Sequence, residues 1–400
     1  MKNHKLIFVI LTGLALGGCK ASDEAQQPGI AEPIEVKYIE KAKLSDLIKL
    51  DYRYLPLQTG SGQLIGAINR LIIRDSSIYI FDASLAKKGY RFDRQGRLMF
   101  SFGETGSGPG EYTLPMDMAV TDNEIAVADN NFSVLFFNKK GEFIKEITTD
   151  YWIYELIPFA DQQFLVYSPT DYSPNGLEET FVLRIMSADC SRSIKGFFPY
   201  EEGLDDYNLS GHMTFYNGIY SYAKPLLGEV YAIDREMNLM PRYQFDFGDH
   251  SWPVDIRELK DDDDRLEEVR KNEEVMSVMH EFLENERYLM FQTIMTTPEN
   301  KNKKLLSAED FWWCLYKKGS KQCYAIHHIV NDMDGEVFDF PIATHRNWLI
   351  SVLYPEELQA NVAARTNESP DNYDGQPTDS LATTDNPVLL FFELKDNIRL

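Results

Sequence analysis

Positive charge is scarce in this chain: of its 400 residues, 40 are Lys or Arg, whereas 63 are Asp or Glu. The formal net charge is −23 at pH 7. Nucleic-acid affinity comes mainly from Lys and Arg side chains that neutralise phosphates, so this composition argues against nucleic acid as a partner. An anionic membrane surface would repel the chain in the same way, and the excess of acidic residues is typical of a solvated surface.

Histidines and catalytic motifs are equally scarce. The 7 histidines form no HxH or HExxH motif, and the chain contains no CxxC pair and no GxSxG nucleophile elbow. His327 and His328 are the only adjacent pair, and because neighbours on a strand point to opposite faces, we expect that they do not bind one ion together. The sequence therefore predicts no catalytic residues, no metal site and no cofactor.

Long hydrophobic runs are absent after the first residues. Lys2 and Lys5 precede an apolar segment, 6–16, which is too short to span a bilayer and predicts a signal peptide over 1–18. The tetrapeptide LGGC that ends at Cys19 is similar to a bacterial lipobox, which implies cleavage before Cys19 and lipidation of its thiol. The alternative is a chance cysteine beside an ordinary signal.

The residues that follow the lipobox, 19–34, are polar and contain two prolines. This composition predicts a flexible tether that lifts the rest of the chain off a lipid surface. We therefore expect an extracytoplasmic protein whose membrane contact is the lipid at Cys19.

Only three further cysteines occur. Cys314 and Cys323 flank a Lys-Gly turn, and with a two-residue loop at 318–319 they would face each other in a non-hydrogen-bonded pair. That spacing and an oxidising location permit a disulfide, and the alternative is two reduced core cysteines. Cys190 has no visible partner, so we expect it to be a small buried hydrophobe.

Strand patterns recur at an interval of about 45 residues, the period of β-propeller blades. In the first two copies a short apolar strand ends at Asp82 or Asp129, and these aspartates lie 47 positions apart. A second strand then leads to a turn at Gly96 or Gly141, and these glycines lie 45 positions apart. Similar units cover 68–102, 116–148, 152–200, 212–248 and 278–329, and a sixth begins at 331.

The sixth unit has about three strands of its own, whereas the chain opens with an orphan strand near 51–58. Placing that strand in the last unit supplies a fourth strand and closes a ring. We therefore predict an all-β, six-bladed β-propeller over 35–400. It is interrupted by a short helical insertion at about 255–275 and by a polar, mobile loop at about 361–385.

The glycine-rich segment 103–112 (GETGSGPGEY) contains no GxxxxGK[ST] motif and is predicted to be a crossover between two units. Together with YLPLQ at 54–58, the PRY–FDFG segment at 241–248 and the closing NPVL at 386–389, it resembles the six-bladed β-propeller lipoproteins of Bacteroidetes, relatives of the NHL-repeat propellers. The resemblance implies a lipid-anchored propeller at the outer membrane or cell surface, and it brings no assigned catalytic residues.

The sequence favours a non-catalytic propeller that binds a glycan, a peptide or a protein partner. Trp252 lies outside the expected strands, so it is the tryptophan expected to reach a face of the ring and stack on a ligand. One alternative is a polysaccharide hydrolase or lyase with acidic residues at the channel mouth, because some of 63 acidic side chains must lie in pairs. The other is a scaffold subunit of an outer-membrane complex.

The mass of the intact native protein tests the anchor. We expect the purified chain to begin at Cys19 and to carry the added mass of acyl chains, because a lipobox directs both cleavage and lipidation. A chain with an unmodified N-terminus would contradict the predicted lipid anchor.

Overall fold

The computed structural model describes residues 31, 33–60, 63–174, 176, 180–200, 211–259, 264, 267–268, 271–300, 307–368, 381–398 and 400. The predicted signal peptide, Cys19 and most of the tether lie outside these residues. Pro33 and Ile34, which the prediction assigned to the tether, begin strand β1 (Pro33–Lys43), in which Ile34 and Val36 are buried. Among the described residues, no helix combines the length and the apolar character needed to cross a membrane.

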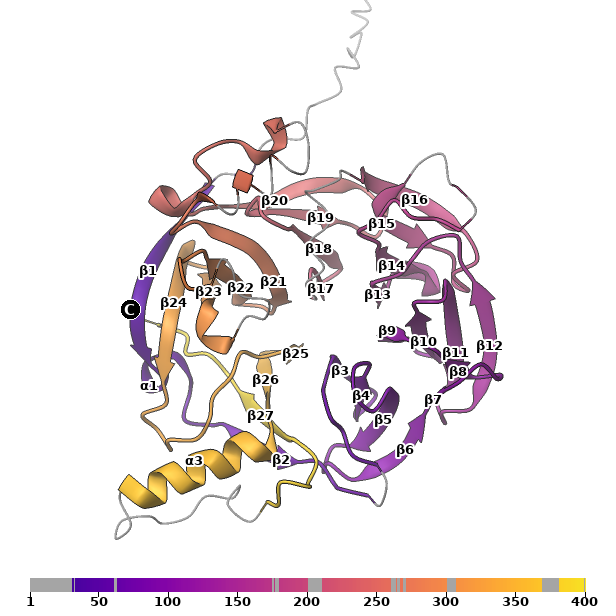
Figure 1. Ribbon diagram of the computed structural model, residues 1–400, viewed down its shortest axis with the longest axis horizontal. Helices are drawn as coiled ribbons and strands as arrows, with labels where there is room; N and C mark the ends of the chain where they lie inside the picture. The colour runs from indigo at the N-terminus through magenta and orange to yellow at the C-terminus, as the bar shows by residue number, and fades with distance from the viewer. Residues whose placement is uncertain are drawn as a thin grey trace, which may run out of the picture.

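Most of the described strands lie in antiparallel groups of four that resemble propeller blades and surround a common axis (Figure 1). The first sheet contains β3 (Arg70–Arg74), β4 (Ser77–Asp82), β5 (Lys88–Asp93) and β6 (Leu98–Phe102). The second contains β9 (Pro115–Val120), β10 (Glu124–Asp129), β11 (Ser133–Asn138) and β12 (Phe143–Thr148). The third contains β13 (Glu155–Pro158), β14 (Phe164–Tyr167), β15 (Phe181–Met186) and β16 (Ser193–Pro199).

A nine-stranded sheet joins two further groups of four. One group is β17 (Met213–Tyr216), β18 (Ile219–Lys224), β19 (Glu229–Ile233) and β20 (Leu239–Asp246). The other is β21 (Met276–Glu284), β22 (Tyr288–Met295), β23 (Phe311–Lys317) and β24 (Gln322–Val330). Strand β1, which the sequence pattern did not predict, lies between β20 and β24 and runs parallel to both.

The last sheet contains β2 (Arg53–Pro56), β25 (Ala343–His345), β26 (Trp348–Leu353) and β27 (Val388–Phe392). Strand β2 pairs with β27 from Arg53 opposite Phe391 to Pro56 opposite Val388. The expected pairing of the early orphan strand with the last unit is therefore confirmed.

Helices are few and short. The described helices are α1 (Leu44–Leu47), α3 (Pro355–Glu368) and the 3-10 turns η1 (Ala160–Gln162), η2 (Gly248–His250), η3 (Ile256–Glu258) and η4 (Ala308–Asp310). Within the predicted insertion at 255–275, η3 and residues 264, 267, 268 and 271 are helical, and the rest of 260–270 lies outside the described residues.

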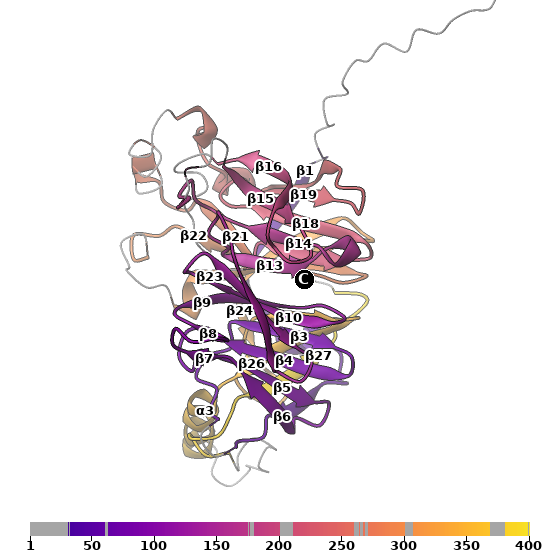
Figure 2. The same cartoon turned by 90° about the vertical axis from the view of Figure 1, so that its right-hand side faces the viewer.

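Helix α3 corrects the prediction of a mobile loop over 361–385, because the chain is helical as far as Glu368. Pro355 stands at the first helical position, which favours a helix start, and Leu358 is fully buried against the last sheet. Both views place α3 outside the ring, beside the sheet of β2 and β27 (Figures 1 and 2). Residues 369–380 lie outside the described residues.

The repeated aspartates hold the loops that enter the innermost strands. The buried Asp82 carboxylate accepts backbone N–H groups from 66–67 and from Leu85. The buried Asp129 carboxylate accepts those of 113–114, directly before β9. The repeat in the sequence is therefore a repeat of buried loop anchors.

The second repeated feature closes the outer hairpin in three of the units. Side-chain oxygens of Asp93 and Asn138 accept backbone N–H groups of the turn that follows, and Asp234 does the same in a later unit. Gly96 and Gly141 in these turns have φ values of 74° and 82°, a left-handed conformation that favours glycine. The equivalence of these three positions, which the sequence predicted, follows from this shared turn chemistry.

The sheets pack face to face through apolar side chains. Between the first two sheets, for example, Tyr79 and Phe81 contact a layer that includes Met118, Val127 and Phe137. All five are at most 2% exposed, so each sheet completes the core of its neighbour.

Replacing the first loop anchor tests this account. We expect Asp82→Ala to lower the free energy of unfolding in urea by about 3 kcal/mol, because three N–H groups lose a buried, charged acceptor. Asp122→Ala is the matched control: its side chain is 81% exposed, and its loss should cost less than about 1 kcal/mol. Equal effects of the two substitutions would contradict the anchoring role.

Candidate functional site

Two cavities meet on the axis of the ring, with volumes of about 680 and 510 Å³. The innermost strands β3, β9, β13, β17, β21 and β25 all contribute residues to the larger one (Figure 1). Arg70, Gly211, Glu281 and Ile342 line both cavities, so the two meet at this level. A site on the axis therefore draws its side chains from every group of four strands.

Charged side chains converge where the cavities meet. We call Arg70, Asp117, Glu155 and Glu281 the axial charge cluster. Arg70 donates from Nε and Nη2 to the two Asp117 oxygens, at 2.7 and 2.5 Å. Glu155 lies with Oε2 4.0 Å from Arg70 Nη2, and its Oε1 accepts the backbone N–H of His212 at 3.2 Å. Asp117 and Glu155 are 5% and 2% exposed, so this network is almost removed from water.

Burial and neighbouring charge shift the pKa values in the cluster. Burial raises the pKa of Glu155 to about 7; Arg70 opposes this shift, whereas Asp117 and Glu281 reinforce it. For Arg70, burial lowers the pKa, but the adjacent Asp117 and Glu155 outweigh burial and raise it overall. The cluster thus combines a permanent cation with a carboxyl group that retains its proton up to near neutral pH.

Two buried histidines stand close to this level. His212 packs its ring 5.0 Å from that of Tyr167, and His280 on β21 packs edge-to-face on Phe311. Burial, followed by the influence of His212, lowers the pKa of His280 to about 3, so this ring is neutral at physiological pH. His280 therefore supplies packing and polarity rather than charge.

The larger cavity also presents an aromatic platform, formed by Phe159, Phe215 and Tyr220. The Tyr220 ring lies 4.4 Å from Phe159 and 4.6 Å from Phe215, and the buried pair supports Phe215, which is 47% exposed. Arg235 and Asp161 line the same cavity. The cavity therefore offers an apolar aromatic surface beside groups that donate and accept hydrogen bonds.

The residues of the axial charge cluster belong to no sequence motif, and the sequence pattern did not single them out. A signal was nevertheless available: Arg70 and Asp117 lie 47 positions apart, the same interval as that between Asp82 and Asp129. Charged residues at one repeat position of successive innermost strands must converge on the axis of a ring. Only the fold brings them to Glu281, far along the chain.

Trp252, the residue predicted to stack on a ligand, lies away from the axis and lines neither axial cavity. Its indole N–H donates to the Leu226 carbonyl at 3.1 Å, and the ring packs against Leu226 and Ile256. Together with Pro33 it lines a separate cavity of about 430 Å³. The structure thus places Trp252 beside the start of β1.

The predicted register of the cysteine hairpin is wrong. The loop between β23 and β24 has four residues, 318–321, so Tyr316 pairs with Cys323 and Cys314 pairs with Ala325. Both thiols are free and buried in one apolar cluster, the arrangement given above as the alternative to a disulfide. Burial raises the pKa of each thiol above its ordinary value. Cys190 is free and fully buried, as expected.

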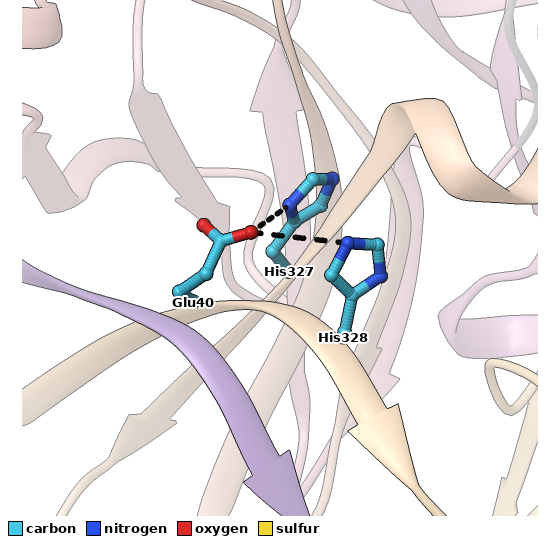
Figure 3. A group of neighbouring side chains, drawn as sticks. All are labelled: Glu40, His327 and His328. Carbon is cyan, nitrogen blue, oxygen red and sulfur yellow. Dashed lines mark hydrogen bonds and ion pairs between the residues drawn. The ribbon is translucent and has the colours of Figure 1, made fainter.

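The prediction that His327 and His328 point apart is also wrong. Their rings stack with centroids 3.9 Å apart, and both face Glu40 on β1 (Figure 3). The pairing of β24 with β23 ends at Ile326, whereas its pairing with β1 continues to Val330. Beyond Ile326 the strand is held on one side only, so strict alternation of side chains is not enforced there.

The pKa of Glu155 predicts a pH dependence of stability. The unfolded chain loses this proton near the ordinary pKa of 4.5, whereas the folded protein keeps it up to about 7. As the pH rises from 4.5 to 7, the free energy of unfolding should therefore fall by about 3 kcal/mol more in the wild type than in Glu155→Gln, which carries no titrating group at this position. Above pH 7 this difference should level off. Urea unfolding of both proteins at pH 4.5 and pH 8 measures this difference. Parallel changes in the two proteins would contradict the raised pKa.

Comparison with known proteins agrees with the fold. No curated protein matches the chain in sequence. A Bacteroides fragilis NCTC 9343 protein described as exported has a similar structure, with a TM-score of 0.71 at 18% identity over 91% of this chain and 100% of that one. A member of the DUF4221 family from Bacteroides vulgatus ATCC 8482 has a TM-score of 0.52 at 11% identity, over 87% and 97% of the two chains. The model of DUF4934, a domain of unknown function, matches residues 30–393, and the chain belongs to that family.

Proposed function

We propose that this chain is a six-bladed β-propeller, lipid-anchored at Cys19 outside the cytoplasm, that binds a glycan in the larger axial cavity. The blade count is supported by the strand grouping, in which β1 is an added strand between two groups, and by the pairing of β2 with β27. The location is supported by the lipobox sequence and by the description of the similar Bacteroides fragilis protein as exported.

The observation that carries the binding proposal is the aromatic platform inside a cavity of ligand size. Pockets for small molecules are usually about 300–1,000 Å³, and the larger cavity, at about 680 Å³, falls within that range. Phe215 offers an exposed ring face on which the apolar face of a sugar ring can stack. Arg235 and Asp161 supply a donor and an acceptor for hydroxyl groups beside it.

A binding role fits the axial charge cluster better than a catalytic role does. Arg70 and Asp117 satisfy each other in a two-point contact, and Asp117 also accepts the backbone N–H of Leu156 at 2.9 Å. Groups paired in this way hold the innermost strands in register at the level where the two cavities meet. They do not leave a charge free to act on a substrate.

One observation favours the alternative of a hydrolase or lyase. Glu155, with a pKa raised to about 7, lines the smaller cavity together with Asp117 and Glu281. A protonated carboxyl group near an ionised one is the arrangement that glycosidic cleavage requires. Incubation of the protein with an oligosaccharide distinguishes the two functions, because only an enzyme would cleave the glycan and release new sugar ends.

Binding should depend on the platform. We expect oligosaccharides to raise the melting temperature of the protein, and Phe215→Ala to weaken binding by calorimetry up to about tenfold, the energy of one lost aromatic contact. Phe143→Ala is the matched control, because Phe143 is also a partly exposed strand phenylalanine but lies on β12, outside the cavity. A flat response to all glycans, a response only to peptides, or equal losses in the two variants would contradict the proposal.

A further inference from the structure

We propose that Glu40, His327 and His328 form a binding site for one divalent transition-metal ion, with Zn²⁺ as the best-suited ion. Glu40 lies on β1, and both histidines lie on the neighbouring β24 (Figure 3). Their three donor atoms lie within 4.8 Å of one another. Glu40 Oε1 is 3.0 Å from His327 Nδ1 and 3.8 Å from His328 Nε2, so one carboxylate oxygen faces both rings.

The contacts of His327 fix which ring nitrogen faces Glu40. Its Nε2 lies 3.1 Å from the Glu309 carbonyl oxygen, which can only accept, so Nε2 carries a hydrogen. Nδ1, 3.0 Å from Glu40 Oε1, is therefore the ring nitrogen that can bind a metal ion beside the carboxylate. A ring N–H bound to a backbone carbonyl is also how metal-ligating histidines are usually oriented.

Aromatic packing holds the His327 ring in place. The ring stacks on Trp312 at 4.4 Å with an angle of 3° between the planes, and His328 stacks on its other side. Trp312 is 7% exposed and is itself packed against Tyr38 of β1. The imidazole that would bind the metal is therefore positioned before any ion arrives, which lowers the cost of ordering it.

The donor set and its spacing favour zinc. Two imidazole nitrogens and one carboxylate oxygen are ligands that Zn²⁺ prefers, whereas Ca²⁺ and Mg²⁺ require more oxygen atoms. Tetrahedral bonds of about 2.0–2.1 Å place donors about 3.3 Å apart, close to the spacing from Glu40 to each ring. The Glu40 side chain is 73% exposed and that of His328 49%, so both can adjust by rotation.

Because of the position of the site, a bound ion would link two strands and keep one coordination position open to solvent. It would join β1, the strand that follows the predicted tether, to β24 in addition to the backbone pairing. Three protein ligands leave a fourth position of a tetrahedral ion free, and the exposure of Glu40 and His328 directs that position to solvent. Water or a donor group from a partner can occupy it.

Zinc titration of the full chain tests the site. The untagged protein in detergent is treated with a chelator, dialysed and titrated with Zn²⁺ by calorimetry. We expect one ion per chain and, at a hundredfold excess of free Zn²⁺ over the dissociation constant, a melting temperature raised by about 3 °C. Ca²⁺ at the same concentration should cause no shift.

Substitutions of the two exposed ligands test whether these side chains bind the ion. Glu40→Gln and His328→Gln should each weaken Zn²⁺ binding at least tenfold and leave the circular dichroism spectrum unchanged, because both side chains are largely exposed. Glu35→Gln, an exposed glutamate on the same strand, is the control and should bind as the wild type does. Absence of zinc binding, or unchanged binding in both site variants, would overturn the proposal and leave a proton-bridged contact. Neither result depends on glycan binding.

Discussion

The backbone hydrogen bonds of residues 33–56 are the interaction on which the rest of the structure depends. Within this short segment, β2 supplies the outer strand of the last sheet, and β1 pairs with the outer strands of two neighbouring groups at once. These pairings cover sheet edges that would otherwise expose unpaired N–H and C=O groups. They also tie the first part of the chain to its end, so the ring of sheets is closed by hydrogen bonding as well as by apolar contacts.

Closure of the ring brings side chains from repeated positions in the sequence together on the axis. Each innermost strand directs its side chains to the axis, where Arg70, Asp117 and Glu155 meet although no two of them are neighbours in the sequence. Their low exposure makes mutual pairing obligatory, because an isolated buried charge would be costly. The paired cluster lies where the two axial cavities meet, and the aromatic platform lines the larger of them. Rigid walls and a pre-formed stacking surface are what a binding protein needs to limit its loss of entropy.

Local patterns in the sequence predicted much of the fold. The repeated Asp82 and Asp129, the glycine turns and the early strand that pairs with β27 were all visible, because each depends on turn chemistry or strand count. Strand β1 was missed, since its partners lie more than 200 positions away and only its first residues alternate strictly between exposed and buried positions. The register of the two hairpin cysteines depends on the length of the loop between β23 and β24, and the stacking of the two histidine rings depends on where the pairing of β24 with β23 ends. Composition specifies neither.

Amide hydrogen exchange across β1 tests most directly whether the early segment 33–43 is held in the folded sheets as these pairings require. The pairings of β1 with β20 and β24 predict that amides of 33–43 exchange as slowly as those of the two partner strands, opening only when the whole protein unfolds. Exchange of 33–43 at the rate of an unstructured peptide, with β20 and β24 still protected, would contradict the account.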